Sequence, residues 1–243
     1  MTRRKRADLL LVERGLFESR TRAQAAIEAG LVTADDVLVR KPSDTLALDC
    51  VLRAAPAHPW VSRGGVKLAA ALDHFGFDAK GCAGLDLGAS TGGFTEVLLA
   101  RGARRIYAVD VGHGQLHKRL AARPEVVVLE GVDARTLTPA LIPEPLAFAS
   151  VDVSFISLKL VLPPVLALLR PPAWLIALIK PQFEAGRRHL KKGLVRDPQV
   201  HTAVCDDIAA FMAAQGLKVV GIIPSPIAGG DGNHEFLIGA QFE

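Results

Sequence analysis

Four ionisable residues stand where predicted apolar strands begin or end. Asp152 and Lys180 each close an apolar run, Asp133 follows another, and Glu235 opens the last one. Such side chains can hold polar groups of a ligand or move protons, and Asp133 could contact an adenine amino group. As ordinary structure, the two aspartates would be helix caps, and Lys180 and Glu235 would be surface charges. An unpaired ammonium directly after an apolar run is costly, so Lys180 needs a carboxylate partner or a chemical role.

The stretch from Gly84 to Thr95, GLDLGASTGGFT, predicts a ligand-binding loop. A short apolar strand enters a glycine-rich turn, and residues 95–101 continue as a helix. The glycines let backbone N–H groups come close to a ligand, and Ser90 and Thr91 add side-chain hydrogen bonds. The alternative is an ordinary strand–helix turn whose glycines serve packing.

A second predicted strand, Arg105 to Asp110, ends in a carboxylate about 20 residues beyond the loop, the place of a ribose-binding acid. The loop lacks both the G-x-G-x-x-G pattern and a Gly-Lys-Ser/Thr ending, which argues against a dinucleotide and a P-loop. An adenosine cofactor without phosphate fits better, and we expect S-adenosylmethionine. The predicted cofactor-binding residues are Asp86, Gly88, Ala89, Ser90, Thr91, Gly92, Gly93, Phe94, Asp110, Val111, Asp133, Ala134 and Asp152.

Strands and helices alternate through the larger part of the chain, which predicts an α/β fold with a parallel sheet covered on both faces. The last two strands are close in sequence and predict a hairpin at the sheet edge. Ligands of such sheets bind at the carboxyl ends of the strands. Strands are expected at 125–129, 146–152, 174–179, 218–223 and 235–240, and helices at 67–75, 114–122, 158–169 and 198–215.

Residues 1–58 read as a separate small α+β module. Helices are predicted at 6–14 and 20–29, with Ser19 as the N-cap of the second. Short extended pieces follow, and the proline-containing segment 54–59 is a linker by composition. Arginines and lysines concentrate where the two helices begin, so they form either a phosphate-binding surface or a solvated helix face. The predicted RNA-binding residues are Arg3, Arg4, Lys5, Arg6, Arg14, Arg20 and Arg22, with Arg63 in the larger domain.

Composition sets broad limits on the kind of protein. Lys and Arg outnumber Asp and Glu by 29 to 25 among 243 residues, which allows a polyanionic partner. The three cysteines are far apart and have no histidines at metal-ligand spacing, so neither disulfides nor a metal site is expected. No apolar stretch is long enough to cross a bilayer, and no signal peptide is recognised. We expect a cytoplasmic protein that does not bind membranes.

The motifs resemble two known families. Arg6-Ala7-Asp8, Arg14-Gly15-Leu16 and residues 19–24 are similar to the S4-like RNA-binding fold. Lys67, Asp152, Lys180 and Glu235 resemble, in order and context, the catalytic Lys-Asp-Lys-Glu tetrad of FtsJ-like ribose 2′-O-methyltransferases. With the small module in front, the whole chain resembles the hemolysin A (TlyA) family of ribosomal RNA methyltransferases.

This resemblance implies an S4-like domain over 1–58 and a class I, Rossmann-like methyltransferase domain with a mostly parallel seven-stranded sheet over 59–243. It also implies methyl transfer from S-adenosylmethionine to a ribose 2′-hydroxyl, for this family a cytidine of 16S and/or 23S RNA in assembled subunits. Lys180 is the expected base, because a ribose hydroxyl must lose its proton as it attacks. Lys67 disfavours the ammonium form of Lys180, whereas Asp152 and Glu235 hold the amines and oppose that effect.

Three other functions remain open from the sequence. A non-catalytic RNA-binding or assembly factor would keep the pocket without turnover. A cytolysin would need membrane-inserting or export segments, and a small-molecule methyltransferase would leave the basic module without a purpose. The oligomeric state is not predicted.

Overall fold

The computed structural model describes residues 3–229 and 232–243. The chain divides into two compact units, Met1–Pro59 and Trp60–Glu243. Each unit has its own core, and each is described by itself below.

The small unit packs two helices against short strands. Ser19 caps the second helix by accepting a hydrogen bond from the Arg22 amide, as predicted. The first helix was predicted to begin at Arg6, but Arg6 is the last residue of a strand, residues 4–6, that pairs with residues 45–47. The core contains Leu10, Leu11 and Ile27. The elements are β1 (Arg4–Arg6), α1 (Ala7–Glu13), α2 (Arg20–Glu28), β2 (Val32–Ala34), β3 (Val37–Leu38), β4 (Thr45–Ala47) and β5 (Leu52–Ala54).

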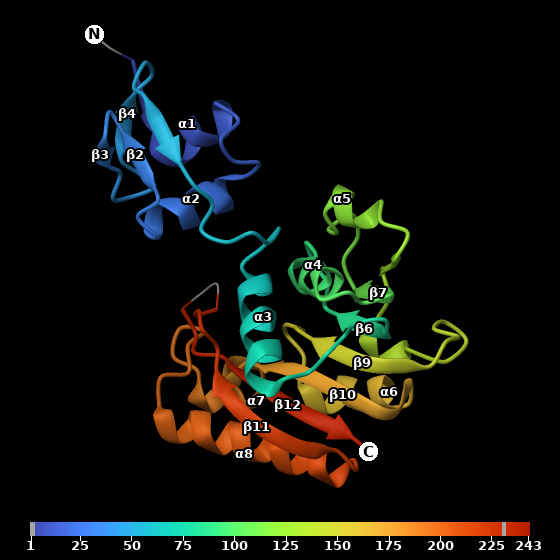
Figure 1. Ribbon diagram of the computed structural model, residues 1–243. Helices are drawn as coiled ribbons and strands as arrows, with labels where there is room; N and C mark the ends of the chain where they lie inside the picture. Colours follow the sequence, from blue (N-terminus) through green and yellow to red (C-terminus); the bar gives the residue numbers. More distant parts are fainter. Residues whose placement is uncertain (1–2, 230–231) are drawn as a thin grey trace. The chain divides into compact units, whose positions relative to one another are not determined.

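Over its described residues, the large unit forms a seven-stranded sheet with the order β11-β12-β10-β9-β6-β7-β8 (Figure 1). Strand β12 runs antiparallel to both of its neighbours, whereas the β10-β9-β6-β7-β8 pairs are parallel. The predicted Rossmann-like class and the edge hairpin are thereby confirmed. The strands are β6 (Ala83–Leu87), β7 (Arg105–Asp110), β8 (Val126–Glu130), β9 (Leu146–Val151), β10 (Leu169–Ile179), β11 (Lys218–Pro224) and β12 (Phe236–Phe242).

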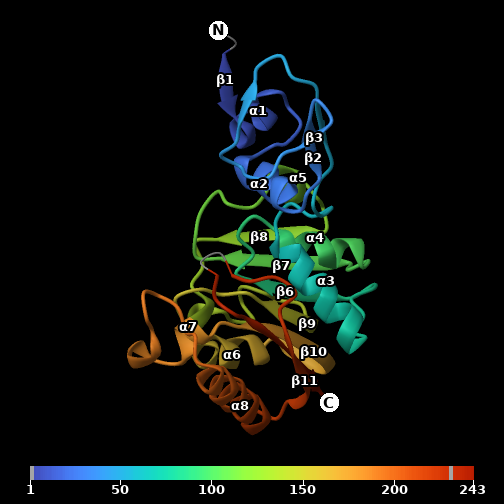
Figure 2. The same ribbon diagram turned by 90° about the vertical axis from the view of Figure 1, so that its left-hand side faces the viewer.

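Helices cover both faces of this sheet, with α3 and α4 on one side and α6 and α8 on the other (Figures 1 and 2). Alternate residues of each strand enter the two cores: Leu175 faces one, and Ile176 faces the other. The helices are α3 (Gly64–Phe75), α4 (Gly93–Ala100), α5 (Lys118–Ala121), α6 (Leu158–Leu166), α7 (Pro181–Glu184) and α8 (Pro198–Ala214), with 3-10 turns at 134–136 and 187–189.

The helix predicted over 114–122 is wrong in its first half, since only α5 at its end is helical. The amides of Gly114, Gln115 and Leu116 donate to the Glu130 carboxylate at the end of β8. A distant side chain thus satisfies the backbone groups that would otherwise begin the helix. Among the described residues, no helix combines the length and apolarity needed to cross a membrane.

Candidate active site

Three of the four predicted catalytic residues lie at one edge of the sheet. Strand β10 pairs with β12 so that Ile179 is opposite Phe236, and Lys180 and Glu235 are the next residues beyond that pair. Asp152 directly follows β9, the parallel neighbour of β10. The carboxyl ends of the parallel strands therefore bring together residues that are far apart in the sequence.

Lys180 is buried and bound on two sides. Its Nζ lies 2.6 Å from Oδ1 of Asp152 and donates to Oγ of Ser154 at 2.9 Å. The Lys180 side chain is only 10% exposed and that of Asp152 is 21% exposed. Lys180 is therefore not a strand-end surface charge, and Asp152 is an ion-pair partner.

Lys67 and Glu235 form the second buried ion pair, with side chains 10% and 4% exposed. Helix α3 positions Lys67, because Leu68 and Leu72 fix the helix against the sheet and its neighbour α4. The two pairs thus join adjacent strand ends to one covering helix. The formal charges of the two amines and the two carboxylates cancel, which lowers the free-energy cost of burying them.

A cleft of about 470 Å³ opens beside Asp152. Gly88 forms part of its wall with a φ of +82°, and a Cβ there would lie 2.3 Å from the Asp152 carbonyl oxygen. Only glycine lets the loop approach so closely. The predicted residues that line the cleft are Gly88, Ser90, Asp110, Val111, Asp133, Ala134 and Asp152.

Two carboxylates in this cleft are already partly engaged. Asp110 accepts hydrogen bonds from the amides of Ser90 and Gly112, both at 2.8 Å, which fixes it at the end of β7. Asp133 caps the 3-10 turn and binds the Arg135 guanidinium, whose contact lowers the pKa of Asp133 to about 2. Asp133 is thus both a helix cap and an ionised acceptor at the cleft wall.

The remaining predicted loop residues do not line the cleft. Asp86 is fully buried beneath it, where Thr95 donates at 2.5 Å and Ser150 at 3.2 Å. Burial raises the pKa of Asp86 to about 7. Phe94 packs in the core between α3 and α4. The predicted residues outside the cleft lining are Asp86, Ala89, Thr91, Gly92, Gly93 and Phe94, and all of them except the exposed Thr91 are buried.

The sequence analysis missed several residues of the cleft. Phe155 is the most distinctive, since its side chain is 90% exposed and its φ is +65°. Its ring lies 4.9 Å from the Phe183 ring, centroid to centroid. One feature of the sequence could have pointed to Phe155: it stands three residues after Asp152 and directly follows Ser154. The other cleft residues that were missed are Leu87, Gln115, Val132, Arg135, Val153, Ser154 and Ile156.

The predicted cationic surface of the small unit is organised by an aspartate. Asp8 is fully buried and accepts from Arg6 at 3.0 Å, from Arg20 at 2.9 Å and from Gln24 at 2.9 Å. These contacts hold the pKa of Asp8 far below its usual range. Arg6 and Arg20 remain 43% and 54% exposed.

The other predicted RNA-binding residues lie largely at the surface. Lys5 pairs with Glu13 at 2.6 Å, and Arg14 donates to the Cys50 carbonyl at 2.6 Å. Arg22 is partly exposed at the start of α2. Arg3, Arg4 and Arg63, the residue before α3, are also exposed.

Comparison with known proteins places these features in a family context. The FtsJ-like methyltransferase model matches residues 60–242, and the S4 domain model matches residues 5–49. The "16S/23S rRNA (cytidine-2'-O)-methyltransferase TlyA" of Mycobacterium tuberculosis is 44% identical, over 98% of this chain and 90% of its own length. The "Putative rRNA methyltransferase YqxC" of Bacillus subtilis is 46% identical, over 98% and 85%. A solved structure named "Putative hemolysin from Streptococcus thermophilus" is 39% identical, with a TM-score of 0.78 over 100% and 90% of the two chains.

Proposed function

The chain belongs to the FtsJ-like methyltransferase family and carries an S4 domain before the catalytic one, and on this premise we propose that it methylates ribosomal RNA. The methyl group goes from S-adenosylmethionine to the ribose 2′-oxygen of a cytidine in 16S and/or 23S RNA. The observation that carries the proposal is the buried Lys180–Asp152 ion pair at the rim of a cleft.

The residues of the cleft fit an adenosine cofactor. The Asp110 carboxylate can accept from ribose hydroxyls, as an acid at the end of the second strand commonly does. Val132 and Ile156 supply apolar contacts for a purine ring, and Asp133 can accept from its amino group. Gly88 keeps the wall open where a side chain would meet the Asp152 backbone. When bound, S-adenosylmethionine supplies an activated methyl group on a cationic sulfur.

Lys180 is proposed to accept the proton of the ribose hydroxyl. Nζ of Lys180 would accept the proton that the ribose 2′-hydroxyl loses on methylation, and bound S-adenosylmethionine would supply the methyl group. Asp152 and Ser154 hold that amine in one position. Base catalysis typically contributes about 10²- to 10⁴-fold in rate, whereas correct alignment contributes roughly 7 to 11 kcal/mol. Positioning is therefore the larger task of these residues.

The Lys67–Glu235 pair is proposed to shape the second side of the reaction site. The buried contact with Glu235 keeps the Lys67 amine in place beside the end of β12.

The RNA-binding part of the proposal rests on the small unit and on Phe155. Exposed guanidinium groups on a rigid S4 domain suit contacts to the phosphates of structured RNA. An exposed aromatic ring at the cleft suits stacking against a base that has left its helix. The partner is proposed to be ribosomal RNA in assembled subunits, which would place the protein in the cytoplasm.

The deciding experiment uses purified 30S and 50S subunits from a strain that lacks this modification. Each is incubated with the protein and labelled S-adenosylmethionine, and the modified nucleotide is located by mass spectrometry. We expect one ribose-methylated cytidine per modified subunit. Calorimetric binding of the cofactor with no label in either RNA would contradict the proposal and favour a non-catalytic assembly factor.

A further inference from the structure

A basic segment between α7 and α8 has no role in the site described so far. This segment, residues 186–196, is called the basic arm here. Four of its cations, Arg188, Lys191, Lys192 and Arg196, have side chains that the structure describes, and these four are exposed. Among the described residues, none of the four has a carboxylate partner in an ion pair. Some other exposed cations of this unit do have one, as in the pairs Arg101–Asp73 and Lys218–Glu243.

The basic arm is held in shape by buried polar groups. Asn233 is 2% exposed, and its side chain accepts from the Val195 amide at 3.2 Å and donates to the Gly193 carbonyl at 3.1 Å. The His201 ring lies 2.9 Å from the Val195 carbonyl. A bridge between Lys191 and Leu194 closes the turn. Ordering like charges costs conformational entropy and repulsion, so this arrangement indicates a partner that offsets both.

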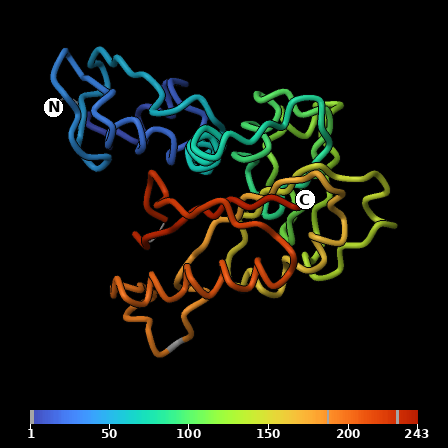
Figure 3. The backbone as a smooth tube through the Cα atoms, turned by 60° about the horizontal axis from the view of Figure 1, so that its bottom comes forward, coloured from blue at the N-terminus to red at the C-terminus, as the bar shows by residue number. Residues whose placement is uncertain are grey.

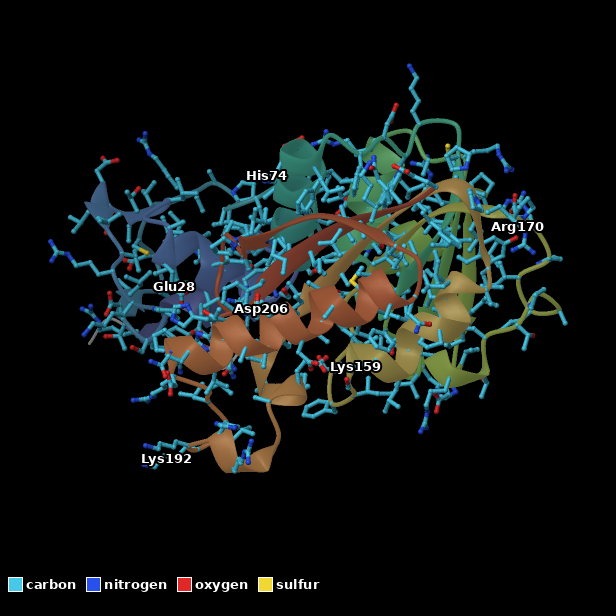
Figure 4. The ribbon with its side chains drawn as sticks, turned by 90° about the horizontal axis from the view of Figure 1, so that it is seen from below. Glu28, His74, Lys159, Arg170, Lys192 and Asp206 are labelled. Carbon is cyan, nitrogen blue, oxygen red and sulfur yellow. The ribbon has the colours of Figure 1, made fainter. Side chains whose placement is uncertain are left out.

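Both ends of the basic arm are tied to the active site. At one end, α7 directly follows Lys180. At the other, the anchoring Asn233 stands two residues before Glu235. Figure 3 shows the chain passing from the sheet through this segment and back into α8. In Figure 4, Lys192 lies on the projecting loop with its side chain pointing away from α8.

We propose that the basic arm is a second RNA-contacting surface, which binds backbone phosphates close to the target nucleotide. The inference rests on the proposed function. A ribose that reaches Lys180 carries a phosphate on each side. The cations of the basic arm are linked to that site, so they are placed to contact these phosphates and their neighbours. Lysine and arginine contacts to phosphate release counterions, which gives binding a steep salt dependence.

The test combines three substitutions, Lys191→Ala, Lys192→Ala and Arg196→Ala, in the full chain. Affinity for the unmodified ribosomal subunit is measured over a salt series. Each lost phosphate contact lowers the salt slope by about 1, so the slope should fall by about 2 to 3 and KM should rise at least about tenfold. The cofactor affinity and melting temperature should not change. Lys218→Ala is the matched control, because Lys218 is exposed but paired with Glu243. An unchanged slope, or an equal loss in the control, would overturn the proposal.

Photo-crosslinking from position 192 separates this inference from the proposed function. We expect cross-links to RNA. Cross-links only to ribosomal proteins would overturn the proposal in favour of an acidic protein partner. Methylation by the wild-type protein, with no RNA cross-link from position 192, would refute RNA binding by the basic arm and leave the proposed methylation intact. RNA cross-links without any methylation would support RNA binding by the basic arm and contradict the proposed methyltransferase activity.

Discussion

Lys180 and Asp152 meet across the ends of two adjacent parallel strands, with Nζ of the lysine 2.6 Å from Oδ1 of the aspartate. Ser154 accepts a further hydrogen bond from the same amine. The amine therefore has a fixed direction beside the cleft. Because the amine is buried and bound, we expect its loss to affect both the proposed proton transfer and the proposed alignment of the ribose hydroxyl.

Lys180→Ala should lower single-turnover methyl transfer by at least about 10²-fold and leave the cofactor affinity within a few-fold. The substitution removes the proposed base but leaves the Gly88–Asp110 side of the cleft intact. Single-turnover kinetics and calorimetry measure the two quantities. Lys159→Ala is the control, because that lysine is partly exposed and pairs with the exposed Asp207. Full turnover by Lys180→Ala would remove this residue from the mechanism.

Glu235→Gln should destabilise the protein by about 3 to 5 kcal/mol, since it leaves the Lys67 ammonium buried without a counter-charge. Chemical denaturation monitors this free energy of unfolding. The double variant Lys67→Met/Glu235→Gln should recover most of that stability and remain inactive. Lys218→Ala, which breaks an exposed pair, should cost at most about 1 kcal/mol. If the double variant methylates RNA normally, the pair is structural only.

Asp86 should make stability depend on pH. Burial raises its pKa from 3.8 to about 7, so the folded state keeps a proton that the unfolded state releases. Stability should therefore fall as pH rises from about 4 to about 7, by about 4 kcal/mol at most, and then level off. Asp86→Asn should flatten this part of the curve in denaturation experiments. The exposed Asp73→Asn should not, and an equal slope in wild type and Asp86→Asn would contradict the prediction.

Arg20→Ala should weaken RNA binding and lower its salt slope by about 1. Arg20 is half exposed and is held by Asp8, so its guanidinium is already oriented for a phosphate. Filter binding to the ribosomal subunit over a salt series measures the effect, and cofactor affinity should be unchanged. Arg53→Ala is the control in the same unit, on an exposed pair with Asp36. Identical affinity for Arg20→Ala and wild type at every salt concentration would refute the role of Arg20.

The sequence predicted those features that depend on local patterns. Apolar runs indicated where the central strands lie, and the residues at their ends included Asp152, Lys180 and Glu235, which the structure brings to one edge. The Ser19 cap was readable because an N-cap needs only a few neighbouring residues. The α/β alternation was sufficient for the Rossmann-like class.

Features that depend on distant contacts were not readable from the residues themselves. The pairing of Lys67 with Glu235 spans 168 positions and came only from family resemblance. The Glu130 carboxylate accepts hydrogen bonds from the amides of residues 114–116, which lie 14 to 16 positions earlier, and the helix predicted there does not form. The buried position of Asp8, which changes how Arg6 and Arg20 present their charge, also needed the folded structure.

The closeness of Gly88 to the Asp152 main chain has an evolutionary consequence. Any side chain at position 88 would push apart the wall of the proposed cofactor cleft and Asp152, which holds the proposed base. On the proposed function, a mutation there should lower donor affinity and turnover together, so selection should not tune one independently of the other at this point. Adaptation to new RNA targets is then expected to accumulate in parts of the chain that leave this junction untouched.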